Sequence, residues 1–189
     1  MESQLSPNST AHQDEPTVAT RRIHEGRILN LREDTVRMPS GREAKREIVE
    51  HAGAACIVPV LPDGRVVVVR QYRKPVEGTL LEVPAGGLEK GEDPLAAAHR
   101  ELAEECNLKG DITPLFTCYL APGYSTELMY GYLALNCQPA EGTPDEDENL
   151  EVEAHPLEDL LAMIETGEIK DSKSLCGLLA LYRQRMQQA

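Results

Sequence analysis

The sequence predicts an α+β fold in which helices sandwich a mixed β-sheet. Most apolar runs are short and rich in Val, Ile and Leu, as is typical of strands. One helical pattern lies between these runs, and two more close the chain. A regular alternation of strands and helices would need a helix after nearly every strand, and the early strands have none. This order of elements therefore favours the α+β class.

The first part of the chain is predicted to be a tail followed by a small β region. Residues 1–20 are polar and lack hydrophobic periodicity, so we expect a disordered tail there. Residues 21–51 contain two extended segments around a Pro-Ser-Gly turn, and we assign them to a β region. The remaining residues, 52–189, are predicted to form one main domain, and the chain is long enough for a sizeable core.

The main domain begins with its strongest strand signals. Residues 54–61 and 65–72 flank a Pro-Asp-Gly turn, which indicates a hairpin. Residues 78–87 read as a short strand that ends in a glycine-rich loop. Three further predicted strands cover residues 111–122, 127–137 and 150–155, and the last of them follows an acidic loop.

Three helices are predicted. Asp93 suits the cap and Pro94 the first position of a helix over Pro94–Cys106. Its apolar stripe is expected to face the core. The members of this stripe are Leu95, Ala98, Leu102 and Cys106. The two helices that close the chain are predicted over residues 156–165 and 172–186.

Glu101, Glu104 and Glu105 cluster beside that apolar stripe. At the edge of the core, mutual repulsion and partial burial both disfavour their charged forms. We expect a cation to compensate them, but Arg100 points elsewhere on the helical wheel, toward Glu92 or a neighbouring loop. Hard divalent cations such as Mg²⁺ bind carboxylate oxygens together with substrate phosphates. The three glutamates are therefore a candidate metal cradle, and the alternative is an ordinary solvated helix face.

Residues 86–108 resemble the signature of the Nudix hydrolase family. That signature reads Gly, five residues, Glu, seven residues, then Arg-Glu-aliphatic-x-Glu-Glu-x-Gly-aliphatic. The matching residues are Gly86, Glu92, Arg100, Glu101, Leu102, Glu104, Glu105 and Leu108. Asn107 stands in the place of the final glycine, and asparagine is the residue next best suited to the positive φ of a helix end.

The resemblance implies a Nudix-like α/β/α sandwich and hydrolysis of a nucleoside diphosphate linked to another group. It also implies that Glu101, Glu104 and Glu105 bind divalent metal, with Mg²⁺ expected and Mn²⁺ as an alternative. Glu92 and Arg100 would brace the loop and the helix. Glu105 itself, or a glutamate from a loop, would accept the proton of the attacking water.

Two stretches before the helix resemble the ADP-ribose and ADP-sugar pyrophosphatase subfamily. In residues 81–92, the resemblance makes the Ala85 carbonyl a further metal ligand and Glu82 a residue that holds substrate. The preceding strand resembles one whose arginine contacts the pyrophosphate, and Arg73 is the candidate for that role. The alternative for Arg73 is a strand-end cation that pairs with nearby acids.

Two stretches after the helix extend the resemblance. In residues 121–130, Glu127 would approach the metals or the terminal ribose; the alternative is a loop carboxylate satisfied by solvent. Residues 144–161 resemble a loop whose glutamate acts as general base, and both Glu146 and Glu148 are candidates. A solvated charge run is the alternative for this loop. The candidate catalytic residues are Arg100, Glu105, Glu146 and Glu148.

The subfamily also implies a homodimer formed through the N-terminal strands. One subunit would then reach the adenosine pocket of the other, with Arg27 and Arg32 as the candidate substrate contacts. The alternative is that both arginines are ordinary surface cations. The expected partner is a small-molecule nucleoside diphosphate derivative.

Composition excludes other classes of function. The net charge of −13 argues against nucleic acid or an anionic membrane as a partner. The five cysteines include no CxxC pair, so we expect reduced, mostly buried thiols. Without an apolar segment at the start or a run of membrane-spanning length, a cytoplasmic protein is expected.

Two rival functions remain open. One is a Nudix hydrolase of dinucleoside polyphosphates or another nucleotide such as NADH. The other is a non-catalytic nucleotide-sensing module. Such modules usually lose the metal-binding glutamates, whereas all three are present here.

Overall fold

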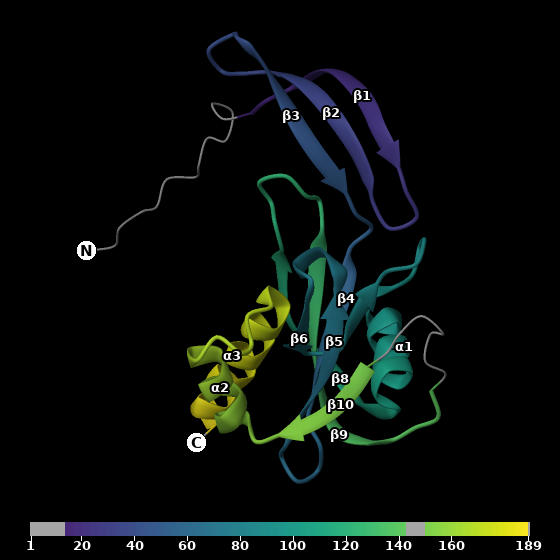
Figure 1. The fold of residues 1–189 in the computed structure, drawn as a ribbon, viewed down its shortest axis with the longest axis vertical. Coiled ribbons are helices and arrows are strands. Elements are labelled where there is room, and N and C mark those ends of the chain that lie inside the picture. The colour runs from purple at the N-terminus through teal and green to yellow at the C-terminus, as the bar shows by residue number, and fades with distance from the viewer. Residues whose placement is uncertain (1–13, 143–149, 189) are drawn as a thin grey trace, which may run out of the picture. The chain divides into compact units, whose positions relative to one another are not determined.

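The computed structural model describes residues 14–142 and 150–188, and the chain divides into two compact units (Figure 1). The first unit contains the described residues up to His51 together with Ala121–Thr126. The second unit contains Ala52–Leu120 and the described residues from Glu127 onward.

The first unit is a three-stranded antiparallel sheet. Its strands are β1 (Thr17–Glu25), β2 (Asn30–Arg37) and β3 (Glu43–Glu50), in that spatial order. β1 begins inside the segment expected to be a tail, and all nine of its residues are exposed. A strand without a buried face lacks the alternation by which strands are recognised in a sequence.

The second unit contains two sheets. One has the order β10-β5-β6, and the other has the order β7-β4-β9-β8. β4 and β9 run parallel whereas their other neighbours are antiparallel, so the predicted α+β class with a mixed sheet is confirmed. The strands are β4 (Ala54–Pro59), β5 (Val66–Arg73), β6 (Gly78–Glu82), β7 (Ala85–Gly87), β8 (Leu108–Tyr119), β9 (Leu128–Pro139) and β10 (Leu150–His155). A 3₁₀ turn, η2 (Lys74–Val76), joins β5 to β6.

The predicted hairpin between residues 54–61 and 65–72 is wrong beyond its turn. Leu61 and Arg65 close the turn through a backbone hydrogen bond of 2.9 Å, and one bridge joins Val60 to Val66. β4 and β5 then separate into different sheets. β4 and the first four residues of β5 are buried on both faces, so their unbroken apolar runs do not indicate which strands pair.

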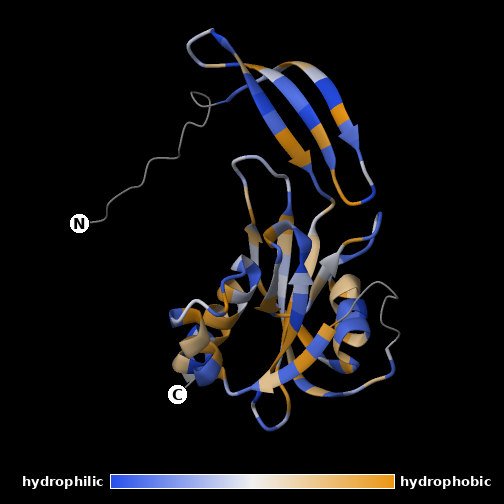
Figure 2. Ribbon diagram, in the orientation of Figure 1, coloured by the Kyte–Doolittle hydropathy of each residue, from blue (hydrophilic) through white to orange (hydrophobic). Residues whose placement is uncertain are grey.

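The helices cover opposite sides of these sheets. α1 (Pro94–Cys106) lies on one side, and α2 (Leu157–Glu165) and α3 (Ser172–Gln188) lie on the other (Figure 1). β4 separates two cores because Cys56 and Val58 pack toward α2 and α3, while Ala55 and Ile57 pack toward α1. Figure 2 shows hydrophobic residues concentrated in the central strands.

The helix boundaries agree closely with those expected. α1 spans the predicted residues, α2 starts one residue later than expected, and α3 continues two residues further. All five cysteines are free and three are buried, as expected. Within the described ranges, no helix is both long and apolar enough to cross a membrane.

One member of the predicted apolar stripe on α1 is exposed. Ala98, Leu102 and Cys106 are buried, but Leu95 in the first turn is 38% exposed. The stripe reaches the core only after the helix has passed its first turn.

We expect Leu102→Ala to lower the free energy of unfolding by about 2–5 kcal/mol, because it leaves a cavity in the core under α1. Leu95→Ala removes the same atoms from the same helix and should change the free energy by about 0.5 kcal/mol or less. Urea denaturation followed by circular dichroism measures both. Equal losses in the two variants would contradict this description of the core.

Candidate active site

Both ends of α1 are capped by the residues that were predicted to end the helix, Asp93 and Asn107. The Asp93 carboxylate accepts hydrogen bonds from the backbone N–H groups of Leu95 and Ala96, at 3.1 and 3.2 Å. Asn107 ends the helix at φ 52°, in the left-handed region that was expected for it. Its side-chain oxygen also accepts a hydrogen bond from the Gly142 N–H at 3.2 Å. Asn107 therefore ends the helix in the conformation expected of the glycine that the signature has at this position.

The three helix glutamates lie at the edge of the core. Glu101 and Glu105 are buried and Glu104 is half-buried. A solvated helix face would leave such carboxylates exposed, so that alternative is wrong for Glu101 and Glu105. Buried carboxylates need a compensating partner.

Arg100 supplies much of this compensation, contrary to the expectation that it points elsewhere. Its Nη1 lies 2.6 Å from a Glu101 carboxylate oxygen and 3.0 Å from one of Glu104. Its Nε and Nη2 donate to the two oxygens of Glu92, each at 3.0 Å, and Nη2 also donates to the Gly87 carbonyl at 3.1 Å. A wheel projection places only Cβ atoms, and the long arginine side chain folds back over its own helix.

Glu105 is held by the backbone of β7. One of its oxygens accepts a hydrogen bond from the Ala85 N–H at 3.0 Å. The next residue, Gly86, faces Glu101 so closely that an added Cβ would lie 2.0 Å from the Glu101 carboxylate oxygen. A side chain at this position would therefore displace the Glu101 carboxylate.

The donor chemistry of this cluster fits a hard divalent cation. The side chains as placed contain no ready-made metal site of three or more His, Cys, Asp or Glu groups among the described residues. However, one cationic nitrogen of Arg100 already lies within 3.0 Å of both Glu101 and Glu104. Carboxylate oxygens are the preferred ligands of Mg²⁺ and related ions. These residues are thus able to hold such a cation if Arg100 gives up its contacts to them.

A second ionic cluster surrounds Glu82 at the end of β6. Arg73 donates to both Glu82 oxygens, at 3.0 and 2.8 Å, so the pairing with a nearby acid that was the alternative for Arg73 is present. The buried Lys173 ammonium forms a close ion pair with Glu82 and lies 2.9 Å from an Asp171 oxygen. Lys173 was not among the residues predicted for the site. The sequence feature that could have indicated Lys173 is its place as a charged residue in the first turn of a helix whose inner face is otherwise apolar.

Both clusters lower carboxylate pKa values. Burial alone would raise the pKa of Glu82, but the hydrogen bonds and charges of Arg73 and Lys173 outweigh burial and hold it below its ordinary value. The hydrogen bonds from Arg100 likewise lower the pKa of Glu92. Such pairs stabilise the fold fully above the ordinary carboxylate pKa, and this stabilisation is lost as the pH falls through the lowered values.

The remaining candidates belong to other parts of the chain. Arg32 lies on β2 in the first unit, where it pairs with Glu50 at 2.8 Å and with Asp34 at 3.3 Å. Arg27 is exposed in the β1–β2 connection of the same unit. Glu127 lies just before β9 and is half-buried. Glu146 and Glu148 lie outside the described residues.

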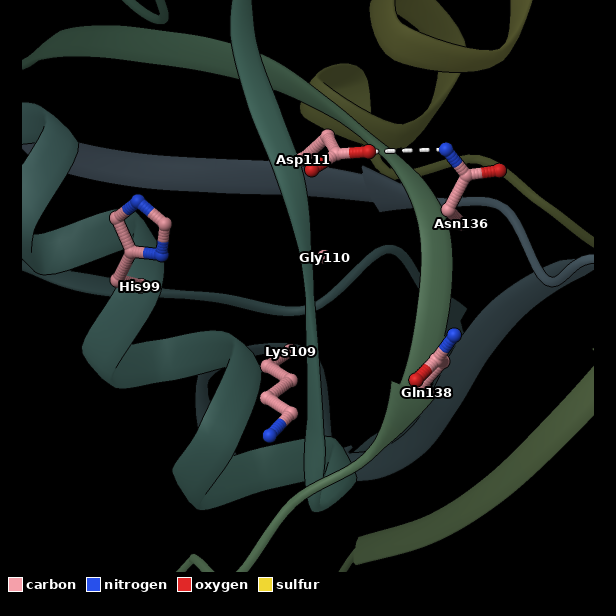
Figure 3. Close-up of a pocket in the computed structure, with 6 residues that line it drawn as sticks. All are labelled: His99, Lys109, Gly110, Asp111, Asn136 and Gln138. Atoms are coloured by element: carbon pink, nitrogen blue, oxygen red, sulfur yellow. Dashed lines mark hydrogen bonds between the residues drawn. The ribbon is translucent and has the colours of Figure 1, made fainter.

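One open pocket of about 370 Å³ is lined by residues of α1, β8 and β9 (Figure 3). It contains none of the candidate site residues. Its floor is the irregular pairing of β8 with β9, where Asn136 donates to Asp111 at 2.9 Å. The lining residues are His99, Lys109, Gly110, Asp111, Asn136 and Gln138.

Two family models match the chain, and the boundary between them at residues 49 and 50 lies close to the boundary between the two units at His51 and Ala52. Residues 50–176 match the NUDIX domain. Residues 15–49 match the nucleoside diphosphate sugar hydrolase N-terminal domain.

Known proteins resemble the chain over most of its length. An "ADP-ribose pyrophosphatase" of Bacillus subtilis (strain 168) is 37% identical over 179 residues, which cover 93% of this chain and 97% of the relative. A "Methanol dehydrogenase activator" of Bacillus methanolicus is 37% identical over 174 residues, covering 90% and 94%. A solved structure described as "Crystal structure of ADP compounds hydrolase" superimposes with a TM-score of 0.83 at 23% sequence identity. The match covers 94% of this chain and 97% of the solved chain, so the two share the fold.

Replacing Gly86 tests the approach of β7 to α1. Gly86→Ala should weaken the binding of Mn²⁺ by about tenfold or more, because the added methyl group displaces the Glu101 carboxylate. Gly87→Ala is the matched control, since an added Cβ at Gly87 meets nothing within 4 Å. Isothermal titration with Mn²⁺ measures both affinities. Equal affinities in the two variants would contradict the role given to this contact.

Proposed function

Because the chain belongs to the Nudix hydrolase family, we propose that it hydrolyses the pyrophosphate of ADP-ribose or a related nucleoside diphosphate sugar. The products from ADP-ribose would be AMP and ribose 5-phosphate. Hydrolysis of dinucleoside polyphosphates or of another nucleotide is the alternative within the family. The sensing module is disfavoured because the three helix glutamates of the signature are present and clustered.

One observation carries this proposal. Three carboxylates cluster on one turn of α1 and two of them are buried; Arg100 bonds to Glu101 and Glu104, and the Ala85 N–H bonds to Glu105. A purely structural cluster would gain stability by replacing a buried carboxylate with a neutral group. The choice of ADP-ribose is supported by the relative from Bacillus subtilis that carries this activity in its name.

We assign the divalent cation to Glu101, Glu104, Glu105 and the Ala85 carbonyl. Mg²⁺ is the proposed ion, with Mn²⁺ as the alternative. When bound, such an ion supplies neutralisation of phosphate charge and a lowered pKa for water. The net charge of −13 would repel a free polyphosphate, so the same ion also supports substrate binding.

The chain's own groups then act on the substrate. Arg73, whose side chain is 38% exposed, donates hydrogen bonds from its guanidinium to the non-bridging phosphate oxygens, on which charge accumulates. A new P–O bond forms from water, and the bridging P–O bond on the opposite side breaks. Glu105 or a loop glutamate, Glu146 or Glu148, accepts the proton of the water. Glu127 is proposed to hold the remainder of the substrate, and Glu82, whose side chain is 2% exposed, is proposed to help hold the substrate through its partner Arg73.

We propose that the first unit forms a homodimer, and that Arg27 and Arg32 contact substrate across it. The support is β1, an edge strand that is exposed along its whole length and carries the apolar side chains of Val18 and Ile23. An exposed strand of this kind is a template for pairing with another chain. The five free cysteines support a reducing compartment, and we propose the cytoplasm.

Glu104→Gln and Glu105→Gln should each lower kcat for ADP-ribose by about a hundredfold or more, because each removes a proposed cation ligand. Glu158→Gln, an exposed site on α2 with the same change in charge, should leave kcat unchanged. Chelation of divalent ions by EDTA should abolish turnover of the wild-type protein. Near-normal turnover in Glu105→Gln would contradict the proposed cation site.

The substrate class is tested by a panel with Mg²⁺ and with Mn²⁺. It contains ADP-ribose, ADP-glucose, a GDP-sugar, NADH and a diadenosine polyphosphate, with phosphate-containing products separated by chromatography. We expect the highest kcat/KM with ADP-ribose or another nucleoside diphosphate sugar. Turnover of the diadenosine polyphosphate alone would favour the alternative function, and turnover of none would contradict both.

Light scattering coupled to size-exclusion chromatography should show a dimer at micromolar concentration. Ile23→Asp should raise the monomer fraction, because it places a charge on the exposed apolar strand β1. Leu179→Asp, at an equally exposed apolar position on α3, is the matched control and should remain dimeric. A monomeric wild-type protein would contradict the proposed assembly.

A further inference from the structure

Glu82 is a buried carboxylate that two cations approach from different environments. Its side chain is 2% exposed. In the described part of the chain it pairs with Arg73, whose side chain is 38% exposed, and with Lys173, whose side chain is 6% exposed. One cation is therefore open to solvent and the other is enclosed.

The start of α3 is bonded to the chain segment that carries Glu82. Asp171 accepts hydrogen bonds from the Ser174 N–H at 3.1 Å and from the Ser174 hydroxyl at 2.6 Å. The Ser174 hydroxyl oxygen accepts in turn from the Val83 N–H at 2.8 Å. Since the Lys173 ammonium lies 2.9 Å from Asp171, these bonds hold it against Glu82 in one position.

We propose that Lys173 is a positioning residue that keeps Glu82 paired, so that Arg73 is free to leave Glu82 and bind the substrate's phosphates. This inference rests on the proposed function, in which Arg73 contacts the pyrophosphate. It goes beyond that function by assigning a role to the enclosed lysine at the start of the C-terminal helix.

The physical reason is the cost of leaving a buried carboxylate unpaired. If Arg73 were the only cation at Glu82, every substrate molecule would have to draw Arg73 away from a carboxylate that water does not reach. With Lys173 in place, Glu82 keeps an ion pair after Arg73 has moved. The two roles follow from the exposure of the two side chains. A ligand can reach Arg73, which is partly exposed, but it cannot reach the enclosed Lys173.

Lys173→Met tests this role because it removes the charge and keeps most of the buried chain. We expect KM for ADP-ribose to rise by about tenfold or more while kcat changes little, since Arg73 would stay bound to Glu82 and substrate binding would weaken. The affinity for inorganic pyrophosphate, measured by titration calorimetry with Mg²⁺ present, should fall by a similar factor. Lys170→Met, at an exposed lysine three residues earlier, is the matched control and should change neither quantity.

The same substitution in a Glu82→Gln background separates positioning from simple structural support. Without the carboxylate charge, Arg73 is released whether or not Lys173 is present. Glu82→Gln and Glu82→Gln/Lys173→Met should therefore have the same KM and the same affinity for pyrophosphate. This comparison leaves no buried carboxylate at position 82, so it also serves if Lys173→Met alone does not fold.

Each result of these experiments either supports or overturns the proposed role of Lys173. Equal KM and pyrophosphate affinity for Lys173→Met and Lys170→Met would overturn the role of Lys173 while leaving the proposed hydrolase standing. So would a tenfold difference between the two variants in the Glu82→Gln background. If the wild-type protein binds pyrophosphate but hydrolyses no nucleotide in the panel, the proposed function fails, and a loss of pyrophosphate affinity in Lys173→Met still supports the inference. A wild-type protein that binds no pyrophosphate overturns the inference.

Discussion

Compensation of negative charge on one turn of α1 is the constraint on which the rest of the site depends. Arg100 bonds to Glu92, Glu101 and Glu104 at once, and Glu105 is held by the Ala85 N–H instead. Arg100 thus shares one positive charge among three carboxylates at the border of an apolar core, and the charge of Arg73 also acts on Glu105. The proposed divalent cation would add positive charge where these carboxylates repel one another.

The buried carboxylate of Glu82 is compensated by cations as well, and a short turn connects it to the strand β7 that contacts α1. Residues 83 and 84 connect β6 to β7, and both helical layers bond to this part of the chain. The Ala85 N–H donates to Glu105 on α1, while the Val83 N–H donates to Ser174 on α3. These bonds link the cluster around Glu82 to the helix glutamates. The proposed roles of the glutamates as cation ligands and of Arg73 as a phosphate contact both depend on such a link.

The sequence identified the helix of the site well and the long-range contacts poorly. Asp93, Pro94 and Asn107 are local signals, so the bounds of α1 and its left-handed end were predictable. The partners of Arg100 and the enclosed position of Lys173 depend on side-chain reach and on packing between distant segments. No local pattern encodes such contacts. β4 and the first half of β5 show the same limit, because a segment buried on both faces can be recognised as a strand while its pairing cannot.

The central claim is that a divalent cation takes over from Arg100 between the helix glutamates when substrate binds. Crystals grown with Mn²⁺ and a non-hydrolysable analogue of ADP-ribose allow a direct measurement by anomalous diffraction. The account predicts anomalous density bonded to carboxylate oxygens of Glu101, Glu104 and Glu105, with the Arg100 guanidinium withdrawn from Glu101 and Glu104. Analogue bound with no anomalous density there, and with Arg100 still paired to both glutamates, would contradict it.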